Sequence, residues 1–97
     1  MEEPTELGSI KNETIYYIKI MNYWTEQHNT LHKTFVFSTF LDAMHWMLKA
    51  SAEIEKLNHH PKWTNMYTTV EVELSTHDAG NRVTEKDWEL ARILDAI

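Results

Sequence analysis

The chain has 97 residues, a length that accommodates a single folded domain. Its apolar fraction of 42% and charged fraction of 25% are typical of globular proteins, which argues against wholesale disorder. The formal net charge is −6 and the nine Lys and Arg residues are scattered, so direct binding of nucleic acid is disfavoured. The absence of cysteine excludes disulfides, thiolate catalysis and thiolate metal ligands.

The N-terminal stretch MEEPTELGSIKNE is acidic and lacks an apolar core, so we do not expect a secretory signal there. No run approaches about 18 consecutive apolar residues, so we expect no membrane span and a soluble, cytoplasmic protein. We interpret residues 1–12 as a polar, mobile lead-in and residues 13–97 as one domain. The segment TIYYIKIM, residues 14–21, fits a strand by its residue types and a helical face by its spacing of three.

Two strands are predicted next, over Tyr23–Glu26 and Leu31–Phe37, joined as a hairpin by the polar stretch QHNT. A long helix follows in STFLDAMHWMLKASAEIEKLN, where Thr39 and Asp42 form a capping-box pattern. Apolar residues recur at helical spacing and predict a core-facing side. This side consists of Phe40, Met44, Met47, Ser51 and Ile54, with Ala43, Ala50 and Leu57 beside them.

The helix is predicted to end near Asn58, because the residue before Pro61 is disfavoured in the α region. A loop then leads to the stretch YTTVEVEL, whose alternating valines predict a strand with one polar face. After the loop STHDAGNRV, a second capping-box pattern opens a helix with Trp88, Ala91 and Leu94 on one side. This order of elements predicts an α+β fold: an antiparallel sheet of about four strands with two or three helices packed on one face.

Histidines stand at the boundaries of these elements. His59 and His60 follow the long helix, and His77 follows the next predicted strand. Loop side chains carried by rigid elements are well placed for function, but the spacing alone does not show that these three converge. Trp63 follows the pair in the predicted loop and is a candidate wall for a ligand. Asp87 is the fourth residue of TEKD, so the role expected for it is that of a helix cap.

Three interpretations of the histidines remain open on this basis. A zinc, copper or iron site needs three or more ligands, and adjacent residues rarely direct both side chains to one ion, so we expect no metal. Ser75 and Thr76 lie near His77, but no nucleophile-elbow glycine pattern surrounds them. The histidines could equally be solvated loop residues, and composition alone favours that alternative over catalysis.

The stretch EKLNHHPKWTNMYTTVEVELSTHDAG, followed by TEKDWELA, resembles the pterin-4a-carbinolamine dehydratase family. The resemblance covers about three-quarters of the chain, from Trp24 to Ile97, and rests on many residues at fixed offsets. It departs from the family in three places: residues 1–23 lack a clear amphipathic helix, the loop GNRVT is one residue longer, and Lys33 replaces the usual arginine. The matching residues are His59, His60, Pro61, Trp63, Tyr67, Val70, Leu74, Thr76, His77, Thr84 and Asp87.

The resemblance implies a cofactor-free dehydration of 4a-hydroxy-tetrahydropterin to quinonoid dihydropterin and water, in the recycling of tetrahydrobiopterin. By this analogy His59 and His77 form the acid–base pair, and His60 mainly holds the pterin. The same analogy assigns the rest of the binding site. It consists of the backbone of His59–Pro61 and of Thr76–Ala79, including Asp78, and a wall completed by Glu55 and Trp63, with Asp87 as a helix cap near the site.

Two other functions remain compatible with the resemblance. Animal members of the family also serve as dimerisation cofactors of a homeodomain transcription factor, so the chain could be a protein-interaction module. A dehydratase-like protein acting in molybdopterin metabolism would carry the same histidines. On the long helix, Met44, Trp46, Met47 and Leu48 place apolar groups on more than one side, from which we expect a homodimer or homotetramer.

Overall fold

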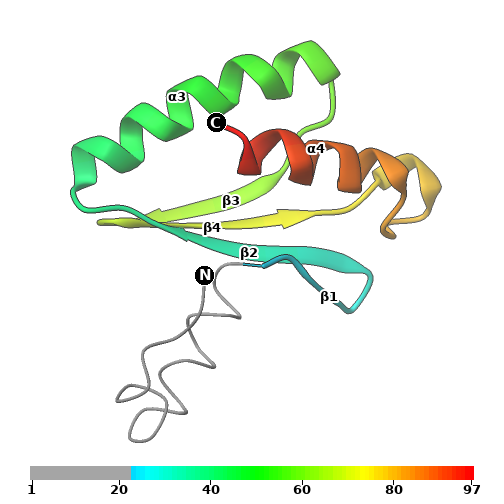
Figure 1. Ribbon diagram of the computed structural model, residues 1–97. Helices are drawn as coiled ribbons and strands as arrows, with labels where there is room; N and C mark the ends of the chain where they lie inside the picture. The colour runs from blue at the N-terminus through cyan, green and yellow to red at the C-terminus, as the bar shows by residue number, and fades with distance from the viewer. Residues whose placement is uncertain (1–22) are drawn as a thin grey trace, which may run out of the picture.

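The computed structural model describes residues 23–97, so the predictions for residues 1–12 and 14–21 lie outside the described residues. The element order is strand, strand, helix, strand, strand, short 3-10 helix and helix (Figure 1). The fold is α+β, as predicted. The elements are β1 (Thr25–Gln27), β2 (Thr30–Val36), α3 (Phe40–Leu57), β3 (Lys62–Met66), β4 (Thr69–Leu74), η1 (His77–Ala79) and α4 (Glu85–Asp95).

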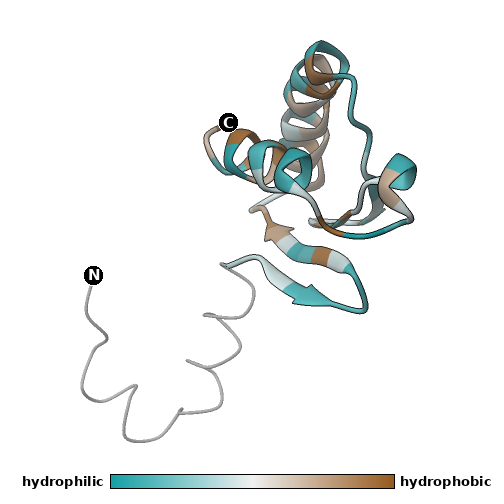
Figure 2. Ribbon diagram, turned by 90° about the vertical axis from the view of Figure 1, so that its right-hand side faces the viewer, coloured by the Kyte–Doolittle hydropathy of each residue, from teal (hydrophilic) through white to brown (hydrophobic). Residues whose placement is uncertain are grey.

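The four strands form one antiparallel sheet in the order β1-β2-β4-β3. Alternate residues of β4 are buried, as the valine pattern predicts: Val70, Val72 and Leu74 are 0–1% exposed. Leu31 and Phe35 of β2 lie opposite Leu74 and Val70 on the same face. This inner face packs against α3 and α4, which both lie on one side of the sheet, as Figures 1 and 2 show.

The β1–β2 hairpin is tighter than predicted. Gln27 pairs with Thr30, so the connection consists of only His28 and Asn29. Both residues have positive φ, 52° and 64°, which is the conformation that matches a two-residue turn to the twist of its strands. The predicted strand bounds are therefore each shifted by one or two residues.

Helix α3 begins as predicted, because the Thr39 hydroxyl accepts a hydrogen bond from Asp42 N–H. The predicted core-facing side is partly wrong. Phe40 is 47% exposed, whereas Trp46 is buried. The buried stripe is Ala43, Trp46, Ala50 and Ile54. Small alanines let the helix approach the sheet closely, and the indole fills the space beside them.

A row of aromatic rings joins α3 to the sheet. The Trp46 ring lies 4.4 Å from Phe35 of β2, 5.6 Å from Phe37 just after β2, and 6.3 Å from Trp63, measured between centroids. The two longer distances fall within the range of favourable aromatic pairs, and the Trp46–Phe35 distance lies at its lower limit. Trp63 belongs to strand β3, so its predicted placement in a loop is wrong.

Strand β3 lies within a segment that the sequence analysis predicted as a loop, so this strand was missed. Its sequence, KWTNM, combines one aromatic and one β-branched residue with three residues of weak strand propensity, so no alternating apolar pattern marks it. Pairing with β4 forms it instead, with Lys62 opposite Glu73 and Met66 opposite Thr69. Tyr67, predicted to start the following strand, lies in the turn with a φ of 55°.

Helix α4 begins with the predicted capping box: Thr84 and Asp87 exchange hydrogen bonds with each other's backbone. Its buried residues are Asp87, Leu90, Ala91 and Leu94, whereas Trp88 is 37% exposed, so the predicted side is rotated by part of a turn. Within the described residues, neither helix combines the length and apolarity that a bilayer crossing would require.

Candidate functional site

The strand β3 brings the histidines together. Because β3 and β4 are antiparallel and Lys62 pairs with Glu73, the residues before Lys62 and those after Leu74 lie at the same end of the sheet. The first group contains His59 and His60, and the second contains His77. The N-terminus of α4 completes this end of the molecule. Convergence of the three histidines, left open by the spacing, follows from this pairing.

Asn58 ends α3 and turns the chain toward the site. It adopts the left-handed conformation, with φ 55° and ψ 43°, and its N–H donates to the carbonyls of Ile54 and Glu55. Asparagine is one of the few residues that tolerate this conformation. The helix therefore ends where it was predicted to end. The left-handed conformation of Asn58 terminates it, in addition to the effect of Pro61.

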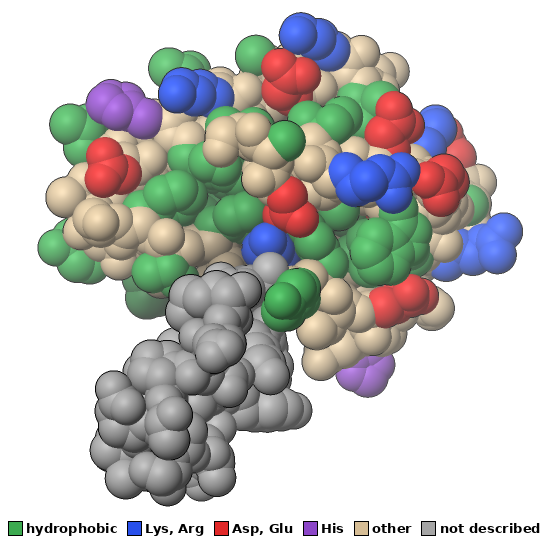
Figure 3. All heavy atoms as spheres, viewed as in Figure 1, with side chains coloured by type: hydrophobic (Ala, Val, Ile, Leu, Met, Phe, Trp, Pro, Cys, Tyr) green, Lys and Arg blue, Asp and Glu red, His purple; other side chains and the backbone are tan. Residues whose placement is uncertain are grey.

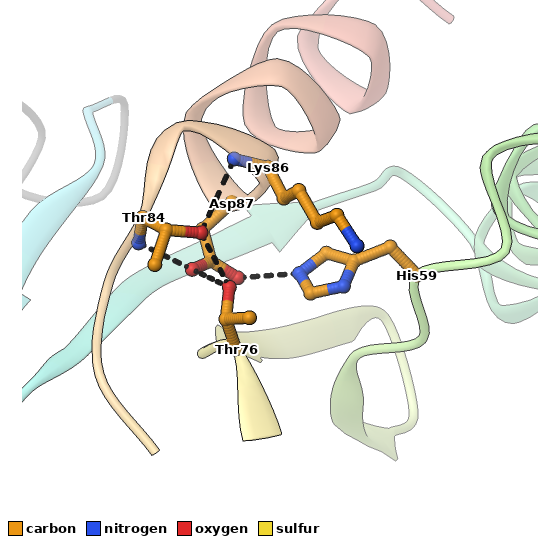
Figure 4. A network of polar contacts seen from close by, with 5 residues as sticks. All are labelled: His59, Thr76, Thr84, Lys86 and Asp87. Carbon is orange, nitrogen blue, oxygen red and sulfur yellow. Dashed lines mark hydrogen bonds and ion pairs between the residues drawn. The ribbon is translucent and has the colours of Figure 1, made fainter. Parts of the chain in front are cut away.

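His59 points inward and contacts a buried carboxylate (Figure 4). Its Nε2 lies 2.6 Å from Asp87 Oδ1, with the His59 side chain 10% exposed and Asp87 fully buried. Asp87 Oδ2 accepts from the Thr84 N–H and from the Thr76 hydroxyl, each at 2.8 Å. Asp87 is thus both the predicted helix cap and the partner of His59. The longer GNRVT loop leaves it within reach.

His60 points the other way, toward solvent. Its side chain is 56% exposed, and its Nε2 lies 2.7 Å from Glu55 Oε1 on the last turn of α3. The two adjacent histidines therefore differ in burial and in partner. Exposed contacts of this kind contribute little to stability, and the consequence of this one is to orient the His60 side chain against the last turn of α3.

His77 lies in the short η1 segment after β4. Its Nδ1 is 3.1 Å from Asn81 Oδ1, across a loop in which Gly80 and Asn81 have φ values of 83° and 58°. The loop is closed by Thr76 N–H donating to Arg82 O. These contacts leave Nε2 as the ring nitrogen of His77 that a ligand can reach.

The three histidines surround one hollow of about 260 Å³. The predicted wall residues Glu55 and Trp63 line a neighbouring hollow of about 270 Å³ together with Pro61, which was expected to contribute its backbone, and His60 borders both hollows. Ala79 borders neither of the two, and its N–H donates to Thr76 O. The first hollow is also lined by Asn58, Ser75, Thr76, Asp78 and Lys86.

Comparison with known proteins places this arrangement in a family. The family model described as "Pterin 4 alpha carbinolamine dehydratase" matches residues 10–97, which include all the residues that border the two hollows. The chain belongs to the pterin-4a-carbinolamine dehydratase family.

The similarity to relatives in this family extends over most of the chain. A protein of Opitutus terrae is 50% identical over 74 residues, 76% of each chain, and one of Bradyrhizobium diazoefficiens is 53% identical over 76 residues, 76% of this chain and 75% of the other. Both bear the name pterin-4-alpha-carbinolamine dehydratase provisionally.

Among solved structures, the transcriptional coactivator/pterin dehydratase from Brucella melitensis is similar, with a TM-score of 0.72 and 34% identity over 89% of this chain and 93% of that one. A pterin dehydratase-like protein described as a RuBisCO assembly factor has a TM-score of 0.63 at 20% identity over 76% of this chain and 84% of that one, which shows a common fold.

Two residues that border the hollow of the three histidines, Asn58 and Lys86, were not predicted from the sequence as members of the site. Asn58 could have been, because an Asn that follows a helix and precedes a turn is a common left-handed cap. Lys86 stands directly before Asp87 and lies alongside His59 at the hollow (Figure 4). Among residues 23–97, no three or more His, Asp or Glu side chains are grouped so that they could hold a metal ion.

Proposed function

We propose that this protein dehydrates a 4a-hydroxy-tetrahydropterin to the quinonoid dihydropterin, with histidines as the acid and base. The observation that carries the proposal is the meeting of three imidazoles from two separate loops around one hollow. Imidazole changes its charge near neutral pH and can both donate and accept a proton, as this reaction requires. Family membership supports the same substrate class.

The reaction breaks the bond between C4a and its hydroxyl oxygen and removes the proton on N5. The leaving hydroxide takes a proton from an acid and departs as water, while a base accepts the N5 proton. We assign these two roles to His59 and His77, whose free ring nitrogens are Nδ1 and Nε2 respectively. A positioned acid or base typically contributes about 10²–10⁴-fold to a rate.

We assign binding of the pterin ring chiefly to His60 and the neighbouring hollow. Trp63 offers an aromatic face there, and Glu55 orients His60 from the last turn of α3. Backbone groups of His59–Pro61 and of His77 and Asp78 are the proposed hydrogen-bonding partners of the pterin edge. Thr76 and Ala79 are less suited to this role, because their N–H groups already donate within the loop.

The test is the double variant His59→Ala/His77→Ala. The absorbance of the quinonoid product, formed from synthetic carbinolamine, measures dehydration against an enzyme-free control. We expect the rate above this control to fall at least about 100-fold, because both proton transfers lose their catalyst. Circular dichroism should show a folded protein, since neither substitution removes a core side chain.

A matched control is the double variant His32→Ala/His45→Ala. These histidines lie on β2 and on the exposed side of α3, and neither borders the two hollows. The control should retain the wild-type rate. A His59/His77 variant that turns over at the rate of this control would refute the proposed function.

The physiological setting that we propose is recycling of tetrahydropterin after aromatic amino acid hydroxylation. The same histidines would serve a dehydratase-like step on a molybdopterin-related compound. A gene for an aromatic amino acid hydroxylase beside the gene for this protein would favour recycling. Genes for molybdopterin synthesis in that position would favour the alternative.

A further inference from the structure

Two hydroxyl groups lie in a row behind Asp87. Thr76 Oγ1 donates to Asp87 Oδ2 at 2.8 Å, and Thr84 Oγ1 lies 2.6 Å from Thr76 Oγ1. At the far end, the backbone N–H of Lys86 donates to Thr84 Oγ1 at 3.3 Å (Figure 4). Thr76 is only 7% exposed, and Thr84 is half-buried.

The direction of every hydrogen bond in the row follows from its two ends. The amide of Lys86 can only donate, and an ionised carboxylate can only accept. Each hydroxyl has one proton, so Thr76 gives its proton to Asp87 and accepts from Thr84. Thr84 therefore directs its proton to Thr76. Only this direction satisfies all the contacts at once when Asp87 is ionised.

The row determines which oxygen of Asp87 remains for His59. Oδ2 receives the Thr84 N–H and the Thr76 hydroxyl, and together they fix the plane of the carboxylate. Oδ1 is thereby held 2.6 Å from His59 Nε2. An accepting Oδ1 requires the proton of neutral His59 to be on Nε2, because the partner of one ring nitrogen selects the tautomer.

We infer that Thr76 and Thr84 are positioning residues that hold neutral His59 as the Nε2–H tautomer, with Nδ1 free to accept a proton at the hollow. The hydroxyl of Thr76 then acts on Asp87 rather than on a ligand, a role separate from the binding role that the resemblance implies for the Thr76 backbone. The consequence for catalysis rests on the proposed dehydration: neutral His59 enters the reaction as a base through Nδ1. The tautomer itself does not depend on the substrate.

The first measurement is the ¹⁵N NMR spectrum of the histidine rings in the full-length, ligand-free protein above neutral pH. The expected spectrum shows His59 with a protonated Nε2 and an unprotonated Nδ1. His59→Gln identifies its signals. A wild-type spectrum with the proton of His59 on Nδ1 overturns the inference, regardless of the results for the Thr76 variants.

The second measurement compares Thr76→Val with Thr76→Ser. Valine keeps the shape of threonine but cannot donate to Asp87, so we expect a mixture of His59 tautomers and a kcat reduced about tenfold or more, with KM changed much less. Serine keeps the hydroxyl and should restore both the spectrum and kcat. A folded Thr76→Val protein with the wild-type tautomer and kcat contradicts the inference.

These measurements distinguish the positioning role of the threonines from the proposed dehydration. If wild-type protein shows the Nε2–H tautomer, Thr76→Val but not Thr76→Ser disturbs it, and the carbinolamine is not dehydrated, the proposed function fails and the positioning role of the threonines stands. If it dehydrates the substrate while His59 carries its proton on Nδ1, the proposed function stands and the positioning role fails.

Discussion

Asp87 is the side chain on which the candidate site depends most. It is fully buried and makes hydrogen bonds with three segments of the chain: the α4 N-terminus, the end of β4 and the loop after α3. Hydrogen bonds to a charged group contribute about 1.5–3 kcal/mol each, and a buried donor left unpaired is costly. One carboxylate therefore links the stability of this end of the molecule to the orientation of His59.

The variant Asp87→Asn should be destabilised even though its side chain has the same size. If its NH₂ group faces the donors on Oδ2, buried donors meet, and if it faces His59, the imidazole must move its proton to Nδ1 to accept. In both orientations the hydrogen bonds lose the charge that strengthens them. We expect the free energy of unfolding to fall by about 2–3 kcal/mol, measured by urea denaturation followed by tryptophan fluorescence.

The control for this measurement is Asp78→Asn, which makes the same chemical change at an exposed residue that borders the hollow of the three histidines. Its unfolding free energy should stay within about 0.5 kcal/mol of wild type. Equal stabilities of the two variants would show that the hydrogen bonds of Asp87 do not stabilise the fold.

At the scale of single residues, the sequence predicted the members of the site better than their arrangement. The family motif selected the histidine trio, and the capping box selected Asp87 as a helix cap. Neither pattern predicted the contact of Asp87 with His59, which is 28 positions away in the chain. Such a contact depends on how α4 sits relative to the end of α3, and no local pattern encodes that.

At the scale of elements, the end of α3 decides where His59 and His60 point. Asn58 ends the helix there with a left-handed backbone, and residues 59–61 then lead into β3. A non-glycine residue other than Asn or Asp pays roughly 1–2 kcal/mol for that conformation. The cap is therefore a local structure with a direct effect on the site.

The variant Asn58→Ala should lower the free energy of unfolding by about 1 kcal/mol, which corresponds to a decrease in Tm of about 4–8 °C for a domain of this size. Asn58→Gly is the matched variant, since glycine adopts the left-handed conformation without steric cost. Calorimetry should place Asn58→Gly close to wild type. A Tm of Asn58→Ala at or above that of Asn58→Gly would contradict the proposed role of the cap.

The elements with strong local patterns were predicted and the others were not. Both helix starts have capping threonines, and β4 alternates valine with polar residues, so their positions agreed with the structure. The strand β3 lacks such a pattern and forms because β4 offers it a partner. The buried side of α3 was misjudged because Phe40 and Trp46 are both large and apolar, and only the packing of rings on the sheet distinguishes them.

At the scale of the whole molecule, α3 has a second apolar side. Trp46, which we had grouped with this side, belongs to the core, but Leu41 and Leu48 are 60% and 72% exposed and Phe40 is 47% exposed. Figure 3 shows hydrophobic side chains reaching the surface on the side of the molecule where α3 lies over the sheet. Large exposed apolar patches usually mark an interface, so the prediction of a homodimer or homotetramer now rests on these residues.

The variant Leu48→Glu tests that prediction. A charge at the centre of a contact between copies would be desolvated without a partner, so we expect a smaller species than wild type in analytical ultracentrifugation at the same concentration. Gln27→Glu adds the same charge at an exposed residue at the end of β1, away from α3, and should leave the mass unchanged. A wild-type protein that sediments as a monomer at micromolar concentration would refute self-association. If instead Leu48→Glu forms the same oligomer as wild type, the interface lies elsewhere, and the apolar side of α3 must be tested for another partner.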